Sequence, residues 1–516
     1  MRQALHYLLA CTVFLLAACD ETAERYDTLI ENGRVFDGER ELPAGTVVGI
    51  NGDQIRYVGP AHSKLMAGNV VDATGLIVSP GFIDPHTHAY QELPDAGPDR
   101  LDSYITQGIT TIFSGNDGGG PVNTGDALAA LDARGVGANF ALFVGHGSVR
   151  REVLGMDNRQ ATVDELARMK LLVGKAMEEG ALGLSSGLFY APGSFAETSE
   201  VIELAKVAAQ HGGVYESHIR DESNYTIGVL GSVDEALTIG SEADIPVHIA
   251  HIKALGVDVW GYSSQIINMI EDAQKKGQIV TADQYPWLAS GTRVSNALIP
   301  RAAMAGGTEA LFARLQDPAT LPALKEAMAE NLRRRGGPSS ILLTSGAERW
   351  LGMRLGEYAE IAGASPVDAA VEIVLAGDAK IASFNMNEMD VEAFMRQPWV
   401  MTSSDGGDGH PRKYASFPEK YREYVVNRQT LSLTDFIHRS TGLTAQTFGL
   451  KDRGFLRAGY KADIVVFDPE TFAPTATYQQ SDQLSAGVRH LIVNGGFAIA
   501  NGEMSDQTFG IAVRKK

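Results

Sequence analysis

The sequence of 516 residues predicts an α/β protein: a (β/α)8 barrel of the TIM type, joined to a small β-sandwich domain that both ends of the chain form. Three observations support this fold class. Eight short apolar segments alternate with helical patterns through the middle of the chain, which is the number of strands that such a barrel needs. The segments on either side of this middle part are typical of short strands linked by turns. Histidine or aspartate follows several of the apolar segments, at the strand ends where barrels of this type place their active sites.

The first residues of the chain predict a targeting signal. Arg2 provides a positive start, and the apolar stretch 8–18 is too short to span a bilayer. The stretch ends in Leu16-Ala17-Ala18-Cys19, which resembles a bacterial lipobox. We therefore expect a lipoprotein signal peptide over residues 1–18, a lipid anchor on Cys19 and a tether over residues 19–26. An ordinary secretory signal with a coincidental cysteine is the alternative.

This signal also predicts where the protein is found. A lipid on Cys19 would hold an exported protein on the periplasmic side of a membrane, and Asp20 resembles a signal for retention at the inner membrane. The other cysteine, Cys11, would be lost with the signal, so the mature chain would have no disulfide and no cysteine ligand or nucleophile. The formal net charge of −19 argues against nucleic acid as a partner.

Two β-rich segments flank the predicted barrel. Residues 27–78 hold short strands separated by turn signals such as Asn32-Gly33 and Asn51-Gly52. The same pattern returns in residues 450–516, where 462–467 and 488–493 are strand candidates. The economical interpretation is one β-sandwich built from both segments.

The barrel is expected over residues 79–449. Helices fill the gaps between its strands, for example over 162–179 and 199–211, with Thr162 and Ser199 as N-caps. The gap between the seventh and eighth strands is too long for one helix, so we expect an inserted subdomain over about residues 300–398 that covers the barrel mouth. The eight strand candidates are 83–86, 110–114, 140–144, 182–185, 214–218, 247–251, 279–283 and 400–403.

Five side chains at these strand ends predict a metal site. His86 and His88 follow the first strand two residues apart, and the geometry of a strand turns both imidazoles to the same side. His218, His251 and Asp405 close the fifth, sixth and eighth strands. Each residue alone would more often be structural. Four imidazoles and one carboxylate at a single barrel mouth, however, suit a zinc-type site.

The chemistry that we expect from this site is hydrolysis of an amide or a related C–N bond. A metal of this kind lowers the pKa of a bound water toward ~7, which makes hydroxide available for attack at neutral pH. A carboxylate that touches both the metal and the water, as Asp405 would, can take a proton from the water and later pass it to the leaving amine.

The order of these residues resembles the amidohydrolase superfamily, and longer motifs resemble its D-aminoacylase, or N-acyl-D-amino-acid deacylase, branch. The resemblance covers about residues 26–500. The motifs that carry it are His86-Thr87-His88, the stretch 180–193, Ser217-His218-Ile219-Arg220-Asp221-Glu222, Ala250-His251-Ile252-Lys253, and Ser404-Asp405-Gly406 with His410-Pro411-Arg412.

The resemblance implies two metal positions. His86, His88 and Asp405 would hold one, and His218 and His251 would hold the other, which is the tighter catalytic zinc in that family. The family often has a bridging cysteine in a Gly-Asn-Cys-Gly stretch after the second strand, where this chain has Asp117. Aspartate is a harder ligand than a thiolate, so the number of zinc ions per chain, one or two, remains open. Glu216 is a second carboxylate candidate, whose simpler interpretation is a buried supporting role.

The resemblance also implies which residues contact the substrate. Lys253 and Arg412 would hold a substrate α-carboxylate, a role for which arginine has the right shape. Tyr285 would act beside Asp405 by polarising the scissile carbonyl. Tyr190 and Arg220 match motif positions near the pocket. His146, at the end of the third strand, is a candidate for supporting the substrate or a metal ligand, with a structural role as the equal alternative.

Taken together, the resemblance implies zinc-dependent removal of the acyl group from N-acyl-D-amino acids. The alternatives are a metal-dependent dipeptidase or cyclic-amide hydrolase on the same scaffold, and a lipid-anchored binding protein without activity. A carboxylate clamp at Lys253 and Arg412 favours acyl-amino acids or peptides over cyclic amides, which carry no such carboxylate. The intact set of metal ligands favours an enzyme over a binding protein.

Overall fold

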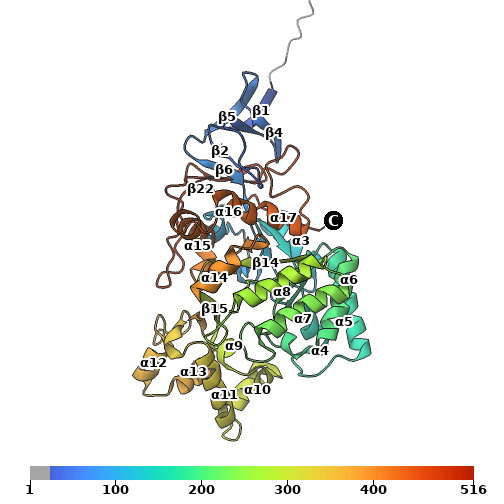
Figure 1. The fold of residues 1–516 in the computed structure, drawn as a ribbon, viewed down its shortest axis with the longest axis vertical. Helices are drawn as coiled ribbons and strands as arrows, with labels where there is room; N and C mark the ends of the chain where they lie inside the picture. The colour runs from blue at the N-terminus through green and yellow to red at the C-terminus, as the bar shows by residue number, and fades with distance from the viewer. Residues whose placement is uncertain (1–23, 516) are drawn as a thin grey trace, which may run out of the picture.

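The computed structural model describes residues 24–515, which form three parts along the long axis of the molecule. Figure 1 shows the β-sandwich at one end, the barrel in the centre and the inserted subdomain at the other end. The predicted signal peptide, Cys19 and the first part of the tether lie outside the described residues. Within residues 24–515, no helix combines the length and the apolar character that a membrane span requires.

The eight predicted barrel strands are all present, and the barrel is confirmed. Parallel pairing joins β10 to β18 through β11, β12, β13 and β14, and joins β7 to β9 through β8. The third strand is broken only at Phe143, so that β9 and β10 form one continuous segment. The strands are β7 (Phe82–Asp84), β8 (Ile109–Ser114), β9 (Asn139–Leu142), β10 (Val144–Gly145), β11 (Gly183–Gly187), β12 (Val214–His218), β13 (Val247–Ile249), β14 (Val280–Gln284) and β18 (Val400–Thr402).

Contacts just beyond the first and last strands close the barrel. Thr87 and Gly406 form a parallel bridge. The buried Asp84 carboxylate accepts hydrogen bonds from the backbone N–H of Ser404 at 3.1 Å and of His86 at 3.2 Å. Because the segments bearing His86 and Asp405 are tied together here, side chains more than 300 residues apart in sequence reach one site.

Amphipathic helices cover the outside of the barrel. In α5, Met169, Val173, Ala176 and Met177 are buried, a spacing that places them on one helix face. Thr162 caps this helix as predicted, and its hydroxyl accepts from the Glu165 N–H at 3.3 Å. The main barrel helices are α3 (Thr124–Arg134), α5 (Val163–Glu178), α6 (Thr198–Gln210), α7 (Gly228–Ala243), α8 (Ser263–Lys275), α14 (Glu388–Met395), α16 (Leu433–Ser440) and α17 (Gly442–Phe448).

The predicted N-cap at Ser199 is wrong, because α6 begins one residue earlier and Glu197 occupies the cap position. Several shorter helical segments lie in the loops between strands and helices. They are α1 (Ala89–Glu92), α2 (Asp102–Ile105), α4 (His146–Leu154), η1 (Gly193–Phe195), α15 (Arg412–Glu419) and the π-helical η4 (Lys420–Asn427).

Both ends of the chain contribute to the β-sandwich. One sheet has the order β4 (Gln54–Pro60), β3 (Thr46–Asn51), β1 (Glu24–Glu31) and β5 (Leu65–Asp72). In the other, β6 pairs antiparallel with β19, which brings residues 77–80 beside residues 464–467. This second sheet has the order β2 (Arg34–Val35), β6 (Ile77–Pro80), β19 (Ile464–Phe467), β20 (Val488–Val493), β21 (Gly496–Ala500) and β22 (Glu503–Met504). Buried Ile30, Val48, Val466 and Ile492 fill the space between the sheets.

The chain ends differ from the expected domain boundaries. The first strand begins at Glu24, so the last residues of the expected tether, 24–26, belong to the sheet. At the other end, the segment after β22 leaves the sandwich and runs along the barrel. There the Val513 N–H donates to the Phe140 carbonyl at 2.6 Å, and Lys515 N–H donates to Gly180 at 3.1 Å.

The insertion between the seventh and eighth strands has its own core and a three-stranded antiparallel sheet. It begins with β15 at Ala289 and ends with β17 at Phe384, so it starts earlier and ends earlier than the expected range of 300–398. Helix α14, which was expected within it, packs against the barrel helix α8. Its elements are β15 (Ala289–Arg293), α9 (Val294–Leu298), η2 (Arg301–Met304), α10 (Gly307–Gln316), α11 (Leu321–Arg334), η3 (Pro338–Ser340), β16 (Ile341–Leu343), α12 (Leu355–Ala362), α13 (Pro366–Leu375) and β17 (Lys380–Phe384).

Candidate metal centre and active site

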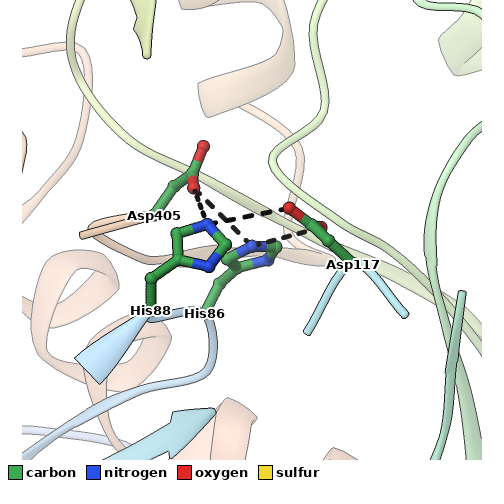
Figure 2. A group of neighbouring side chains, drawn as sticks. All are labelled: His86, His88, Asp117 and Asp405. Carbon is green, nitrogen blue, oxygen red and sulfur yellow. Dashed lines mark hydrogen bonds and ion pairs between the residues drawn. The ribbon is translucent and has the colours of Figure 1, made fainter. Parts of the chain in front are cut away.

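Four side chains from three loops meet at the carboxyl ends of the barrel strands. Figure 2 shows the His86 and His88 imidazoles with the carboxylate of Asp405 on one side and that of Asp117 on the other. His88 Nε2 lies 3.2 Å from Asp405 Oδ1 and 3.7 Å from Asp117 Oδ2. His86 Nε2 lies 3.4 Å from Asp117 Oδ1. The four residues have the spacing of a group that holds a metal ion.

A second group of possible metal ligands shares Asp117 with the first. Asp117 Oδ1 is 3.4 Å from His251 Nε2 and 3.6 Å from His218 Nδ1. These two imidazole nitrogens are themselves 2.9 Å apart. The carboxylate of Asp117 therefore stands between two sets of ligand atoms, one at the first and eighth strands and one at the fifth and sixth.

The backbone at three of these ligands adopts an unusual conformation. The φ angle is +57° at Asp117, +34° at His251 and +47° at Asp405, in the left-handed region that non-glycine residues rarely occupy. Such strain persists only where the surrounding structure enforces it, and it is found preferentially at functional sites. Here it turns side chains that follow the strands back over the barrel mouth.

The carboxylates and imidazoles at this site shift one another's pKa values. Burial raises the pKa of the Asp117 carboxyl, but the imidazoles of His86, His218 and His251 outweigh burial and hold that pKa well below its usual value. Burial lowers the pKa of His251, and the surrounding carboxylates reverse the effect and raise it to about 9. A metal bound by these imidazoles would compete with protons for the same nitrogen atoms.

The residues present fit a metal ion. His86 Nε2 and Asp117 Oδ1 are buried atoms without a hydrogen-bond partner in the described part of the chain. Buried polar atoms are rarely left without a partner, and imidazole with carboxylate is the donor set that zinc-type ions take. Of the sequence-predicted ligands, the structure brings His86, His88, His218, His251, Asp405 and Asp117 together.

Buried carboxylates support these ligands from below. Glu216 Oε1 lies 3.4 Å from His86 Nδ1, and burial raises the Glu216 pKa to about 8. Asp283 Oδ2 is 3.8 Å from the same nitrogen and accepts at 2.9 Å from His248. A metal-bound imidazole is commonly oriented in this way through its second ring nitrogen. Glu216 therefore lies under the ligands, in the supporting position that was its simpler interpretation.

Arg412 and Tyr285 lie beside Asp405. Arg412 Nη1 is 2.7 Å from Asp405 Oδ2, and its guanidinium lies 4.8 Å from the centre of the Tyr285 ring. The His410 imidazole fixes the backbone of this arginine. Its Nδ1 accepts from the backbone N–H of Arg412 at 3.1 Å, and its Nε2 contacts the Ala289 carbonyl at 3.0 Å. Burial raises the pKa of Tyr285 well above its ordinary value, so the hydroxyl keeps its proton.

Lys253 and Glu222 form an ion pair beside His251. Lys253 Nζ lies 2.5 Å from Glu222 Oε1 and 2.6 Å from His251 Nδ1. Glu222 Oε1 is in turn 3.1 Å from the same imidazole nitrogen. Sequence reasoning missed the role of Glu222, although it is part of the motif 217–222 that contains His218.

A cavity of about 350 Å³ leads from the surface to this site. His88, Asp117, Tyr190 and Arg412 line it, together with residues of the insertion such as Thr292. A second, smaller cavity, here called the inner cavity, shares part of this lining. It reaches Lys253, Glu222 and Tyr285 and has the insertion residue Arg335 in its wall. The insertion thus supplies one wall of the mouth.

Two residues expected near the substrate, Arg220 and His146, form ion pairs outside the cavity. The Arg220 guanidinium binds the Glu235 carboxylate at 2.8 Å and donates to the carbonyls of Ser194 and Ala196. The His146 imidazole is buried against Glu200 at 2.9 Å. Neither side chain is part of the cavity wall. Arg220 instead braces the segment around η1 that follows Tyr190, and His146 is tied to α6 through Glu200.

Comparisons with known proteins agree with this geometry. A family model described as the amidohydrolase family matches residues 69–499. The chain belongs to the amidohydrolase family. With its two groups of metal ligands beside a carboxylate, this amidohydrolase is a metal-dependent hydrolase of C–N bonds.

Several relatives are similar to this amidohydrolase over nearly its whole length. A D-aminoacylase and an N-acyl-D-glutamate deacylase, both from Alcaligenes xylosoxydans xylosoxydans, are each 33% identical to it. The matches cover 92% of this chain, with 94% of the first relative and 93% of the second. A solved structure of N-acyl-D-glutamate deacylase from Bordetella bronchiseptica, complexed with zinc and a phosphonate inhibitor, is 29% identical. It has a TM-score of 0.81 and covers 95% of this chain and 100% of its own.

Proposed function

We propose that this amidohydrolase removes the acyl group from N-acyl-D-amino acids and uses zinc to do so. One observation carries the proposal: the Asp405 carboxylate lies between the metal-ligand group and Arg412, in a cavity that also holds Lys253 and Tyr285. This places a proton acceptor, two cations and a phenol around one small space. The names of the relatives support N-acyl-D-amino acids as the substrate class.

The described residues offer places for one or two zinc ions. His86, His88, Asp117 and Asp405 would hold one ion, and Asp117, His218 and His251 would hold the other. Bound there, zinc would supply a Lewis acid and lower the pKa of water at the site. The shared position of Asp117 supports two ions.

Asp405 is suited to move the proton of the reaction. Burial opposes its ionisation, but Arg412 and His251 outweigh burial and hold its pKa far below the ordinary value. It is therefore ionised at neutral pH and can accept a proton from water at Oδ1, on the side of His88. The same oxygen can then donate that proton to the leaving amine.

Tyr285 is suited to bind the scissile carbonyl. Its hydroxyl is buried, remains protonated, and has no hydrogen-bond partner among residues 24–515. A donor that is already in place as negative charge develops on the carbonyl oxygen lowers the barrier, because no reorganisation is needed during the reaction. Lys253 and Arg412 both lie near the Tyr285 ring, at 5.7 and 4.8 Å from its centre, and are placed to hold the α-carboxylate of the amino acid.

Substituting either cation tests the proposed substrate class. We expect Lys253→Ala and Arg412→Ala each to lower kcat/KM for N-acyl-D-amino acids by roughly 10- to 100-fold, the range for losing a hydrogen bond to a charged group. The matching N-acyl-D-amino acid amides lack the carboxylate, so kcat/KM for them should fall much less. Steady-state kinetics on both series measures the difference. Lys275→Ala, an exposed lysine of α8, is the control.

An equal loss on both series would overturn the carboxylate assignment. Turnover of cyclic amides at the same rate as acyl-amino acids would point to the cyclic-amide alternative.

We further infer that the protein is a lipoprotein on the periplasmic side of a membrane, with the inner membrane favoured. The lipobox-like sequence before Cys19 supports this location. Figure 1 adds that β1 lies in the sandwich, at the opposite end of the molecule from the insertion that borders the cavity. A tether at β1 would therefore attach the protein at the end opposite to the insertion.

Lipid labelling of cells tests the location. We expect the protein to incorporate labelled palmitate and to sediment with membranes, and Cys19→Ser to abolish the label and release the protein. An unlabelled protein in the soluble periplasmic fraction would show that the ordinary secretory signal is the correct interpretation.

A further inference from the structure

An arginine of the insertion reaches the inner cavity without a carboxylate partner. Arg335 follows α11, is 1% exposed, and lies in the wall of the same cavity as Lys253, Tyr285 and Arg412. The other two cations of this cavity are both ion-paired, Lys253 with Glu222 and Arg412 with Asp405. Over residues 24–515, no carboxylate lies within ion-pair distance of the Arg335 guanidinium.

Neutral groups hold Arg335 on one side only. Its Nε donates to the Ala297 carbonyl at 3.2 Å. When the Asn385 side-chain amide is oriented so that its nitrogen donates to the Ser383 carbonyl, its oxygen accepts from Arg335 Nη1 at 3.1 Å. The guanidinium also lies 5.9 Å from the centre of the Tyr225 ring. These contacts fix the orientation of the group and leave Nη2 without a hydrogen-bond partner in the described chain.

A second buried cation without an ion-pair partner in the described chain lies near Arg335. A second guanidinium, that of Arg301, stacks 3.9 Å above the Phe189 ring, and its buried Nε has no hydrogen-bond partner in the part of the chain that the structure describes. Burial, with Arg335 as a further contributor, lowers the Arg301 pKa to about 10. The nearby Asp221 is engaged elsewhere, because its carboxylate accepts from the N–H groups of Ser223, Thr226 and Gly228.

Burying an unpaired charge is costly unless another charge compensates it when the site is in use. We propose that Arg335 binds a second carboxylate, carried by the side chain of the substrate, so that the preferred substrates are N-acyl-D-amino acids with acidic side chains. This inference rests on the proposed function. Lys253 and Arg412 then hold the α-carboxylate, and Arg335, in the wall of the same cavity, holds the carboxylate of an aspartate- or glutamate-like side chain.

The wild-type enzyme provides the first test. We expect zinc-loaded enzyme to prefer N-acetyl-D-glutamate over N-acetyl-D-glutamine by roughly 10- to 100-fold in kcat/KM, because these substrates have nearly the same shape and differ in one charge-assisted hydrogen bond. The preference should appear mainly in KM. Equal kcat/KM values for the two substrates would overturn the inference while leaving the deacylase function intact. Failure to hydrolyse any N-acyl-D-amino acid would overturn both.

Variants of Arg335 provide the second test. Arg335→Gln should lose the preference, because kcat/KM should fall much further for N-acetyl-D-glutamate than for N-acetyl-D-glutamine. Arg335→Lys should retain part of the preference. Arg333→Gln is the matched control, since Arg333 is 51% exposed and paired with Asp258 and Glu330. If Arg335 had a purely structural role, Arg335→Gln would lower kcat/KM equally for both substrates, and that result would contradict the proposal.

Discussion

Asp405→Asn should lower kcat by roughly 10²- to 10⁴-fold, the range that a positioned acid–base group contributes. Asparagine has nearly the same size as aspartate and keeps an oxygen that can face His88, so most of the fold and part of the metal affinity should survive. It cannot take a proton from water or return one to the leaving amine. It also loses the charge that holds Arg412 at 2.7 Å.

Two measurements separate the chemical role of Asp405 from a loss of metal. Zinc per chain and circular dichroism should stay close to the wild type, while the single-turnover rate falls. Asp272→Asn, at an exposed position of α8, controls for the substitution itself. Near-normal turnover in zinc-loaded Asp405→Asn would rule out the proton transfer that we assign to this residue.

Asp117→Ala should have the largest effect on metal binding. Its carboxylate stands within 3.4 to 3.7 Å of all four imidazoles, so its removal takes a ligand from both groups at once. We expect zinc affinity to fall by more than the roughly 10- to 100-fold that follows loss of a group supporting a ligand. Turnover at limiting zinc should fall with it.

Equilibrium dialysis against a zinc buffer measures this loss directly. Glu216→Gln alters a group that supports His86 and the Asp117 backbone but removes no ligand, so it should lose less zinc than Asp117→Ala. Asp117→Cys should restore binding and, with cobalt in place of zinc, add the thiolate charge-transfer absorption that the wild type lacks. Unchanged zinc content and affinity in Asp117→Ala would contradict the shared-ligand assignment.

The sequence predicted that the histidines meet, because the barrel topology fixes where the strand ends lie. Parallel barrel strands all end at one face, so His86, His218, His251 and Asp405 had to meet there once the eight strands were recognised. The sheet that joins both chain ends followed from similar reasoning, since an isolated short β segment cannot bury a face of its own.

Loop geometry was not predictable in the same way. Asp117 reaches both ligand groups through a left-handed backbone that sequence periodicity does not reveal. Arg220, expected near the substrate, is drawn away by Glu235 in α7, a partner that sequence spacing could not indicate. The place of Arg335 in the cavity wall depends on how the insertion folds over the barrel. The predicted boundaries of the insertion were wrong, because β15 begins at Ala289, within the stretch assigned to the barrel.

The most direct test of the central claim is the rate at which zinc-reconstituted protein, lacking residues 1–19, releases free amino acid from paired N-acetyl-D- and N-acetyl-L-amino acids. Our account predicts release from the D-enantiomers, with little from the L-enantiomers, that disappears when the metal is removed and returns when zinc is restored. Release from the L-enantiomers or from dipeptides instead, or D-selective release that persists without metal, would contradict it.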